Sequence, residues 1–405
     1  MKWETVKIGD LCEITSSKRI FYSEYVDSGV PFYRSKEIIE KTQGQSISEP
    51  LYISEEKYSE IKDKFGVPVA GDMLLTSVGT IGIPYIVKPN DYFYFKDGNL
   101  TWFRNFDKKL ASSFLYYWIG SKEGFGILNN TTIGSSQKAL TISALKQIEI
   151  PLPPVEKQRI IVVALSAFDN LIENNQKQIK LLEEAAQRLY KEWFIDLRFP
   201  DHESTPIHNG IPEGWEKTSL DEVIEFNPKY VLPKEGEKRV FPMAALSTSS
   251  MILDWSQSEL SSSTSGTKFS NGDTLLARIT PCLENGKTAF VDGLLDGEVA
   301  TGSTEFIVMQ SKVISPYMVY LLARSSDFRE TAINSMTGSD GRQRAQVDKL
   351  KQYPYLRPSQ LIIDQFGTFA APIFMQIHGL NKQNSDLQEA RDRLLPKLMS
   401  GEIEV

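Results

Sequence analysis

Cysteine and histidine are scarce in this chain. Among 405 residues there are 2 cysteines, Cys12 and Cys282, and 3 histidines, His202, His208 and His378. Cysteines so far apart, without a Cys-x-x-Cys pairing, exclude a disulfide-stapled scaffold and the usual zinc-ligand spacings. We therefore expect a reduced, cytoplasmic protein without a metal centre.

Long apolar runs are missing as well. The run at 160–165 is among the longest, whereas a transmembrane helix needs about 20 apolar residues. No apolar stretch follows a basic start, so we expect no secretory signal. The sequence therefore predicts no membrane contact.

Positive charge is not in excess. The chain has 45 Lys and Arg against 52 Asp and Glu, a net charge of −7. A protein that binds nucleic acid by itself usually carries a basic excess. If this chain binds DNA, its basic groups must cluster in space, or a partner must supply much of the phosphate contact.

Catalytic motifs are absent too. There is no P-loop, no Gly-x-Ser-x-Gly and no His-Glu-x-x-His. The Asn227-Pro228-Lys229-Tyr230 segment is similar to the Asn-Pro-Pro-Tyr element with which adenine methyltransferases hold the target amino group. Its second proline is missing, and no glycine-rich loop for S-adenosylmethionine precedes it, so an Asn-Pro turn is the ordinary interpretation. We expect a protein that is not an enzyme.

What the chain does contain is a duplicated unit. Four motifs occur twice in the same order, at 3–4 and 215–216, 71–75 and 272–276, 101–103 and 304–306, and 184–189 and 389–394. The second pair reads Gly-Asp-x-Leu-Leu and the third Thr-x-Phe. Two similar halves can present two similar surfaces, which suggests a two-fold target.

The order of patterns along the chain predicts its organisation. In 1–150, short apolar runs alternate with Gly, Pro, Asn and Asp turns, as strands do, and the pattern returns in 215–356. The predicted fold class is α+β, with two pseudo-symmetric α/β globular domains separated by two long antiparallel coiled-coil helices. The expected boundaries are 1–153 for the first domain, 154–198 for the first helix, 199–214 for a linker, 215–357 for the second domain and 358–405 for the second helix and tail.

Each predicted helix carries a heptad seam. From Leu165 to Trp193 the seam residues step by 3 and 4, and the pattern returns 205 residues later. The predicted helix–helix contacts are Leu165, Phe168, Ile172, Asn175, Ile179, Leu182, Leu189, Ile373, Ile377, Leu380, Asn384, Leu387 and Leu394. One asparagine in each seam can fix the register at a cost in stability. A first helix from about residue 155 to 196 would be on the order of 60 Å long.

A sustained seam favours two facing helices. The alternative is that each helix packs only on its own domain, which needs no seam of this length. A parallel pair would require a very long return path, so we expect an antiparallel pair and a dumbbell-like molecule.

Several motifs resemble those of one known family. The segment at 151–160 closely resembles the junction between target-recognition domain and conserved helix in type I restriction-modification specificity subunits, and 393–403 resembles their C-terminus. The segment at 211–216 looks like the opening of their second recognition domain, and 71–82 looks like their internal signature. The resemblance covers essentially the whole chain, although 353–358 departs from the first junction and leaves the start of the second helix open.

This resemblance implies a DNA-recognition subunit without catalytic activity. Each globular domain would read one half of a bipartite site in double-stranded DNA, and the helix pair would set the spacing. Two modification subunits would dock on the chain and methylate adenine with S-adenosylmethionine. Restriction subunits would add an ATP- and Mg-dependent nuclease, and this chain itself would hold no cofactor.

Base edges are read by Arg, Lys, Asn, Gln, Ser and Thr side chains, and such residues gather in loops at matching places of the two copies. The predicted DNA-binding residues are Arg34, Ser35, Lys36, Thr76, Ser77, Ser136, Gln137, Lys138, Arg278, Arg342, Gln343 and Arg344. For each of them a solvated loop residue is the alternative. The loops at 134–138 and 338–344 are the strongest candidates, because both combine flexible glycine with a basic tip.

Two other functions stay open at this point. The chain could be a bivalent protein-binding scaffold that never touches DNA, or an enzyme with its own fused methyltransferase. The missing S-adenosylmethionine loop disfavours the second of these.

Overall fold

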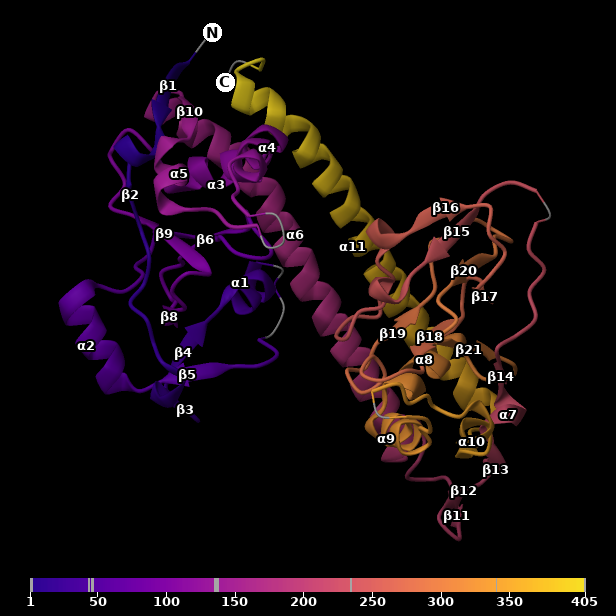
Figure 1. Ribbon diagram of the computed structural model, residues 1–405. Coiled ribbons are helices and arrows are strands. Elements are labelled where there is room, and N and C mark those ends of the chain that lie inside the picture. The colour runs from indigo at the N-terminus through magenta and orange to yellow at the C-terminus, as the bar shows by residue number, and fades with distance from the viewer. Residues whose placement is uncertain are drawn as a thin grey trace. The chain divides into compact units, whose positions relative to one another are not determined.

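The computed structural model describes residues 3–42, 44, 47–134, 138–233, 235–339 and 341–403 (Figure 1). The chain divides into two compact units, Met1–Glu173 with Ser385–Val405 as unit 1, and Asn174–Asn384 as unit 2. Each unit contains one globular head and part of each of two long helices. We call the heads head 1 (residues 3–152) and head 2 (residues 215–357).

Head 1 is built on two four-stranded sheets and a strand pair. The first sheet has the order β2 (Glu13–Thr15), β9 (Leu100–Arg104), β6 (Met73–Thr76) and β7 (Pro84–Ile86), all antiparallel. The second has the order β3 (Tyr25–Val26), β5 (Leu51–Ile53), β4 (Val30–Tyr33) and β8 (Tyr94–Phe95), with β4 and β8 parallel. The pair joins β1 (Glu4–Lys7) to β10 (Glu149–Leu152).

The helices of head 1 are α1 (Ser35–Thr42), α2 (Glu55–Phe65), α3 (Ser112–Gly120), α4 (Lys122–Asn130) and α5 (Ile142–Gln147), with short 3-10 turns at η1 (Ile8–Asp10) and η2 (Tyr22–Glu24). All four residues of the central strand β6 are buried. Since side chains alternate between the two faces of a strand, both faces of β6 are covered. Met73 and Leu75 join the core under α3, whereas Leu74 joins a second core with Trp102. This explains why the motif at 71–75 is apolar at consecutive positions.

Head 2 repeats the first sheet and the terminal pair of head 1 strand for strand, and three strands of the second sheet. Its first sheet has the order β14 (Ile224–Phe226), β21 (Phe306–Ser311), β18 (Thr274–Ala277) and β19 (Thr288–Phe290). Its second has the order β16 (Glu259–Ser261), β15 (Lys238–Phe241), β20 (Ala300–Gly302) and β17 (Thr267–Phe269), with β15 and β20 parallel. The edge strand β17 pairs with β20, whereas β3 of head 1 pairs with β5. The terminal pair is β13 (Glu216–Ser219) with β22 (Pro354–Arg357). The duplication read from the sequence is therefore a duplication of the fold.

The helices of head 2 are α7 (Leu220–Val223), α8 (Pro316–Arg324), α9 (Ser326–Asn334) and α10 (Val347–Lys351), with 3-10 turns at η4 (Met243–Ala245) and η5 (Trp255–Gln257). Between the first long helix and head 2, the linker forms a small hairpin of β11 (Ile207–His208) and β12 (Ile211–Pro212).

One predicted match between the copies is wrong. Leu75 pairs with Thr101 in the first head, and Leu276 pairs with Ile307 in the second. Because Leu75 and Leu276 end the same repeated motif, the counterpart of Thr101 is Ile307 and not Thr304. The match between 101–103 and 304–306 is off by three residues, since a Thr-x-Phe identity is too short to fix the register of a strand.

The repeated Gly-Asp turn serves the fold. The glycine before each aspartate has a positive φ, +92° and +87°. Asp72 accepts a hydrogen bond from Trp102 Nε1 at 2.8 Å, and Asp273 accepts one from the Tyr230 hydroxyl at 2.7 Å. Burial raises the pKa of Asp72, and it raises the pKa of Asp273 to about 6. The buried carboxyl group of this turn thus accepts its side-chain hydrogen bond from a different donor in each head.

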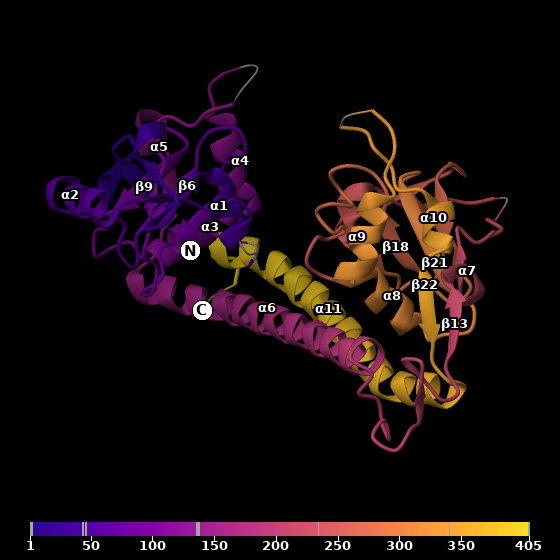
Figure 2. The ribbon, with the colours of Figure 1, turned by 90° about the horizontal axis from the view of Figure 1, so that it is seen from below.

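The long helices are α6 (Val155–Tyr190), which ends in a π-helical turn at η3 (Lys191–Ile195), and α11 (Gln360–Ser400). They run side by side in opposite directions (Figures 1 and 2). In unit 1, Leu165 shares a core with Leu394 and Leu398, and in unit 2, Ile179 shares one with Ile377. The predicted fold class, mixed α/β heads with a long antiparallel helix pair, is confirmed. The degraded junction at 353–358 is still a strand followed by a helix, as at the first junction.

All thirteen predicted seam residues are buried or half-buried. The same apolar cores also include head residues, for example Phe114 in unit 1 and Leu321 in unit 2. Each long helix therefore packs both on the other helix and on a head. The two interpretations of the seam, helix–helix packing and packing on the own domain, are both correct in part.

Polar contacts bind the helices within each unit. In unit 1, Arg391 of α11 bonds Asp169 of α6 at 2.6 Å, and the Tyr117 hydroxyl of α3 donates to the other oxygen of Asp169, also at 2.6 Å. In unit 2, Glu183 of α6 is 5% exposed and accepts hydrogen bonds from the Ser250 hydroxyl and the Met251 amide. Burial raises the pKa of Glu183.

A head-to-helix ion pair occurs at the same place in both units. Lys88 follows β7 and lies 4.0 Å from Glu173 of α6. Asp292 follows β19 at the corresponding position and lies 3.2 Å from Nδ1 of His378 in α11. Head 1 supplies a lysine to this contact and head 2 supplies a carboxylate, and the contact of head 2 is an ion pair when His378 is protonated. In the part of the chain that the structure describes, no helix is long and apolar enough to cross a membrane.

Candidate nucleic-acid interface

In head 1, two loops that are far apart in the sequence are joined by their backbones. Val78, in the loop after β6, forms an antiparallel bridge with Ala139, in the loop after α4. The Gly79 amide donates to the Lys138 carbonyl at 3.3 Å, and the Leu140 amide donates to the Ser77 carbonyl at 2.9 Å. We call residues 77–83 and 131–141 the paired loops of head 1.

Head 2 contains the same arrangement. Ile279, after β18, bridges Arg344, after α9. The Thr280 amide donates to the Gln343 carbonyl at 3.0 Å, and the Ala345 amide donates to the carbonyl of Arg278 at 2.8 Å. Residues 278–287 and 335–346 are the paired loops of head 2. Two groups of residues that the sequence predicted separately, at 278 and at 342–344, therefore form one surface element.

The start of α1 joins the paired loops of head 1. The Ser35 hydroxyl donates to the Asn99 carbonyl at 3.3 Å, and the Ser77 amide donates to the same oxygen at 2.8 Å. The predicted regions at 34–36 and 76–77 thus meet at Asn99, and Lys138 is linked to the second of them through the paired loops.

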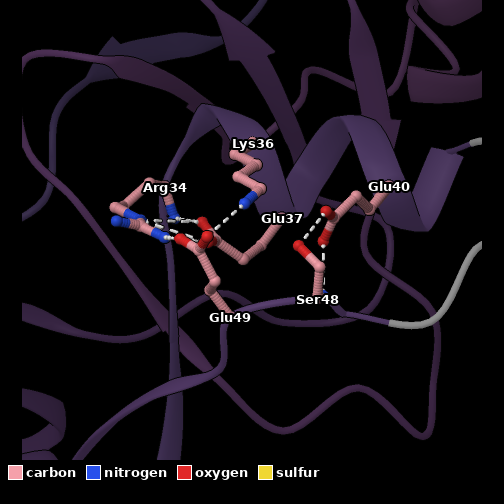
Figure 3. Close-up of polar contacts among 6 residues, drawn as sticks. All are labelled: Arg34, Lys36, Glu37, Glu40, Ser48 and Glu49. Atoms are coloured by element: carbon pink, nitrogen blue, oxygen red, sulfur yellow. Dashed lines mark hydrogen bonds and ion pairs between the residues drawn. The ribbon is translucent and has the colours of Figure 1, made fainter. Parts of the chain in front are cut away.

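Arg34 and Lys36 lie in a cluster of opposite charges (Figure 3). Glu37 is 0% exposed and bonds Arg34 Nε at 3.1 Å and the Arg34 amide at 2.7 Å. The hydrogen bond with Glu37 raises the pKa of Arg34. The buried carboxylate therefore fixes the direction of the guanidinium, and the Arg34 side chain as a whole is 30% exposed.

A second carboxylate in this cluster is exposed. Glu49 lies 3.1 Å from Lys36 Nζ and 3.7 Å from Arg34 Nη2, and its side chain is 67% exposed. Its hydrogen bond with Lys36 lowers the pKa of Glu49. On the same side of α1, Glu40 holds Ser48 through the hydroxyl at 2.6 Å and the amide at 3.1 Å (Figure 3). One solvent-facing carboxylate is thus shared by two candidate cations.

The prediction that Thr76 and Ser77 bind DNA is wrong for their side chains in this structure. Thr76 and Ser77 are 0% and 1% exposed. Thr76 Oγ1 accepts from the Ile83 amide at 2.9 Å, and Ser77 Oγ lies 2.6 Å from Thr101 Oγ1. Their hydroxyls close the loop from inside and cannot reach a ligand in this conformation. Buried strand-end hydroxyls and solvated loop hydroxyls look alike in a sequence.

Among the other head 1 candidates, Lys138 lies in the second paired loop. Lys138 is exposed, and its Nζ donates to Asn129 Oδ1 at 2.8 Å. Ser136 and Gln137 lie outside the described residues.

The four candidates of head 2 differ in exposure and in their contacts. Arg278 is half-buried and donates from Nη2 to the Ala345 carbonyl at 3.2 Å. Arg342 is exposed, and Gln343 is half-buried. Arg344 forms a two-pronged ion pair with Glu305, in which Nε lies 2.9 Å and Nη2 2.6 Å from carboxylate oxygens. This contact raises the pKa of Arg344 and lowers that of Glu305.

The sequence did not single out Asn99 and Glu305. Strand register makes them counterparts, as it does Ser77 and Arg278. The amides of Ser77 and Arg278 donate to the carbonyls of Asn99 and Glu305, respectively. An alignment of the copies by strand register, instead of by short identities, would have found the pair.

No group of three or more potential metal ligands occurs among the described residues. The Asn-Pro segment is a structural turn, in which Asn227 has φ of +53° and accepts from the Val308 amide through Oδ1 at 3.0 Å. That side chain is occupied by backbone, which supports the ordinary interpretation of the motif.

Comparisons with known proteins agree on one kind of relative. Residues 1–184 match the family model described as type I restriction modification DNA specificity domain. The chain is 28% identical over 427 residues to the type I restriction enzyme MjaIX specificity subunit of Methanocaldococcus jannaschii, covering 100% of this chain and 94% of that protein. It is 31% identical to the type I restriction enzyme EcoAI specificity subunit of Escherichia coli over 48% of this chain and 35% of that protein.

Among solved structures, the crystal structure of the S subunit of a type I restriction-modification system from M. genitalium superposes with a TM-score of 0.56 at 15% identity. The match covers 98% of this chain and 96% of that chain. At this identity the likeness shows a common fold.

Proposed function

We propose that this chain, which belongs to the family of type I restriction-modification specificity subunits, selects a bipartite DNA site by reading one half with each head. The paired loops are the observation that carries this proposal. Both heads present them on the same backbone frame, whereas the side chains at their tips differ. A common frame with different polar tips suits two readers of different half-sites.

The charge balance fits recognition with help from partners. Arg34 and Lys36 are each near a carboxylate, and Arg344 is paired with Glu305. These cations neutralise few phosphates by themselves, so the modification subunits would supply much of the phosphate contact. The expected behaviour is weak binding by the isolated chain and tight, specific binding by the assembled complex.

The long helices offer apolar side chains to such partners. In unit 1, Ile160, Val163 and Leu171 of α6 are 48%, 68% and 48% exposed. In unit 2, Leu181 of α6 and Met375 of α11 are both 63% exposed. Large exposed apolar groups on a long helix are suited to cover by another helix. We assign the docking of two modification subunits to these faces.

The chemistry would belong to the partners. Modification subunits would flip and methylate an adenine with S-adenosylmethionine, and restriction subunits would use ATP and Mg. This chain would contribute recognition and half-site spacing through the antiparallel helix pair.

The test is a map of methylated adenines in the host genome with and without this gene. Loss of one bipartite methylated motif on deletion, and its return on complementation, is the expected result. An unchanged methylation map would reject the proposal and favour a bivalent protein scaffold. The variants Arg342→Ala and Arg344→Ala discriminate further, because a scaffold without DNA contact would tolerate both.

A further inference from the structure

Arg344 and Glu305 form a coupled difference between the two heads. Arg344 bridges Ile279 at the position where Ala139 bridges Val78 in head 1. Glu305 stands where head 1 has Asn99. Both members of the pair are therefore special to head 2, although the backbone around them is repeated.

The ion pair uses one edge of the guanidinium group. Nε and Nη2 of Arg344 face Glu305, and Nη1 makes a long contact of 3.4 Å with the Arg342 carbonyl. A guanidinium group has five N–H donors in one plane. The edge between Nη1 and Nη2 carries one N–H of each nitrogen side by side, and the ion pair with Glu305 uses the other edge, between Nε and Nη2. The side chain is 42% exposed.

Two parallel N–H donors match one nucleobase best. Guanine presents the O6 and N7 acceptors side by side in the major groove, and arginine reads them with two parallel hydrogen bonds. Adenine offers an acceptor beside a donor there, which two N–H donors cannot satisfy. A guanidinium plane already fixed by a carboxylate also loses less conformational freedom on binding.

We propose that Glu305 positions Arg344 to read a guanine in the half-site of head 2, an inference that rests on the proposed function. Arg344 is the base-reading residue, and Glu305 is the positioning residue that acts through it. Head 1 has alanine and asparagine at these places and reads its own half-site by other side chains.

A purely stabilising ion pair is the competing explanation. Exposed ion pairs contribute little to stability, and the same bridge in head 1 forms with alanine at this place. The loop therefore does not need the ion pair to close. Glu305 is also near a second cation, because Arg278 contributes to the lowering of its pKa. The carboxylate is thus bonded to Arg344 by two nitrogens and lies in the field of a second cation.

The experiment uses the full chain assembled with its modification subunits and a DNA library in which each position of the two half-sites is varied. Methylation of every sequence is measured by sequencing for the wild type, Arg344→Ala, Arg344→Lys and Glu305→Gln. Arg344→Ala is expected to lower the preference for guanine at one position of one half-site by about 10-fold or more. Arg344→Lys keeps the charge but not the fork, so it is expected to keep overall binding and lose the same preference.

Glu305→Gln is expected to weaken the preference at that same position and to leave the other half-site unchanged. Arg357→Ala is the matched control, since Arg357 is also 42% exposed and also paired with a glutamate, Glu216, but lies on the β13–β22 pair. Thermal unfolding of each variant separates loss of fold from loss of reading.

The outcomes decide between the explanations. A uniform drop in methylation with an unchanged base profile in Arg344→Lys and Glu305→Gln would overturn the inference and assign the pair a structural role. If the wild-type complex methylates without any sequence preference, the proposed function fails instead, and the two failures are thereby distinguished.

Discussion

Asn175 of α6 donates a hydrogen bond from Nδ2 to Oδ1 of Asn384 in α11 at 3.0 Å, inside an otherwise apolar seam. The two residues are 4% and 7% exposed. Nδ2 of Asn175 also donates to Gln383 Oε1 at 2.9 Å. A buried amide pair is satisfied in only one alignment of the helices, so it selects a register at some expense of stability.

Replacing one asparagine should therefore cost more than replacing both. Asn175→Leu leaves Oδ1 of Asn384 buried without this donor and should lower the free energy of unfolding by about 1–3 kcal/mol. The double variant with leucine at both positions should recover most of that loss, because no polar group is then stranded. Denaturant titration of both variants measures this, and a double variant less stable than the single one would contradict the argument.

The same double variant should affect the spacing of the recognised half-sites. With leucine at both positions the helices can pack in more than one register. Methylome sequencing is then expected to show bipartite sites with more than one spacing, whereas Asn175→Leu alone keeps the wild-type spacing. A single unchanged spacing in the double variant would assign register to the apolar seam instead.

Arg391 should matter more than its neighbour Arg393. Arg391 is 29% exposed and bonds Asp169, which also accepts from Tyr117. Arg391→Met removes a charged hydrogen bond inside unit 1 and should cost about 1–3 kcal/mol. Arg393 lies 2.6 Å from Glu389 but is 78% exposed, so Arg393→Met should change stability by less than about 0.5 kcal/mol. Equal effects of the two substitutions would show that the Asp169 contact contributes nothing special.

Asp273 should make the stability of head 2 depend on pH. Burial raises the pKa of Asp273 from 3.8 to about 6, so the folded state binds more protons than the unfolded state between these values. Its contribution to stability is therefore greatest below about pH 4 and falls as the pH rises towards 6. The difference is on the order of 3 kcal/mol.

Asp273→Asn should flatten this dependence, because an amide accepts the Tyr230 hydrogen bond without ionising. Urea unfolding at pH 4.5 and 7 is the measurement, with the exposed Asp296→Asn as control. If the wild type and Asp273→Asn lose stability in parallel between these two pH values, the buried carboxyl group is not the cause.

Removal of the Glu49 carboxylate should strengthen DNA binding. Glu49 is shared by Lys36 and Arg34 and is largely exposed, so a phosphate has to compete with it for the same cations. Glu49→Gln is expected to raise the affinity of the assembled complex by roughly 2- to 5-fold at low salt, with less effect at high salt. Glu60→Gln is the matched control, since Glu60 also lies between two lysines, Lys57 and Lys64, on α2. Equal binding of both variants would separate this cluster from the DNA contact.

The scaffold could be predicted from the sequence because its signals are periodic or repeated. The heptad from Leu165 onward located both helices, and the repeated Gly-Asp turn located the same strand in both heads. These patterns arise from burial, which acts at many positions at once. Short identities were less reliable, as the mismatch of Thr101 with Thr304 shows.

The candidate site could be predicted only in part. The sequence found Arg278 and Arg344 but not the bridge that brings their loops together, because a contact between distant loops leaves no local pattern. Thr76 and Ser77 were misplaced for the same reason, since only the fold shows that their hydroxyls face inward. The carboxylates Glu37, Glu49 and Glu305 escaped a search for DNA-binding residues because they are anionic.

The reversed head-to-helix ion pairs, Lys88 with Glu173 and Asp292 with His378, bear on how such chains can exchange parts. A head moved without its helix segment would place a lysine beside a histidine, or an aspartate beside a glutamate. Two carboxylates then face each other in one case, and in the other a lysine faces a histidine that also carries a positive charge when protonated. Recombination that transfers a head together with the helix segment it touches avoids this conflict. These contacts therefore favour exchange of a head together with the helix segment that it contacts over exchange of the globular head alone.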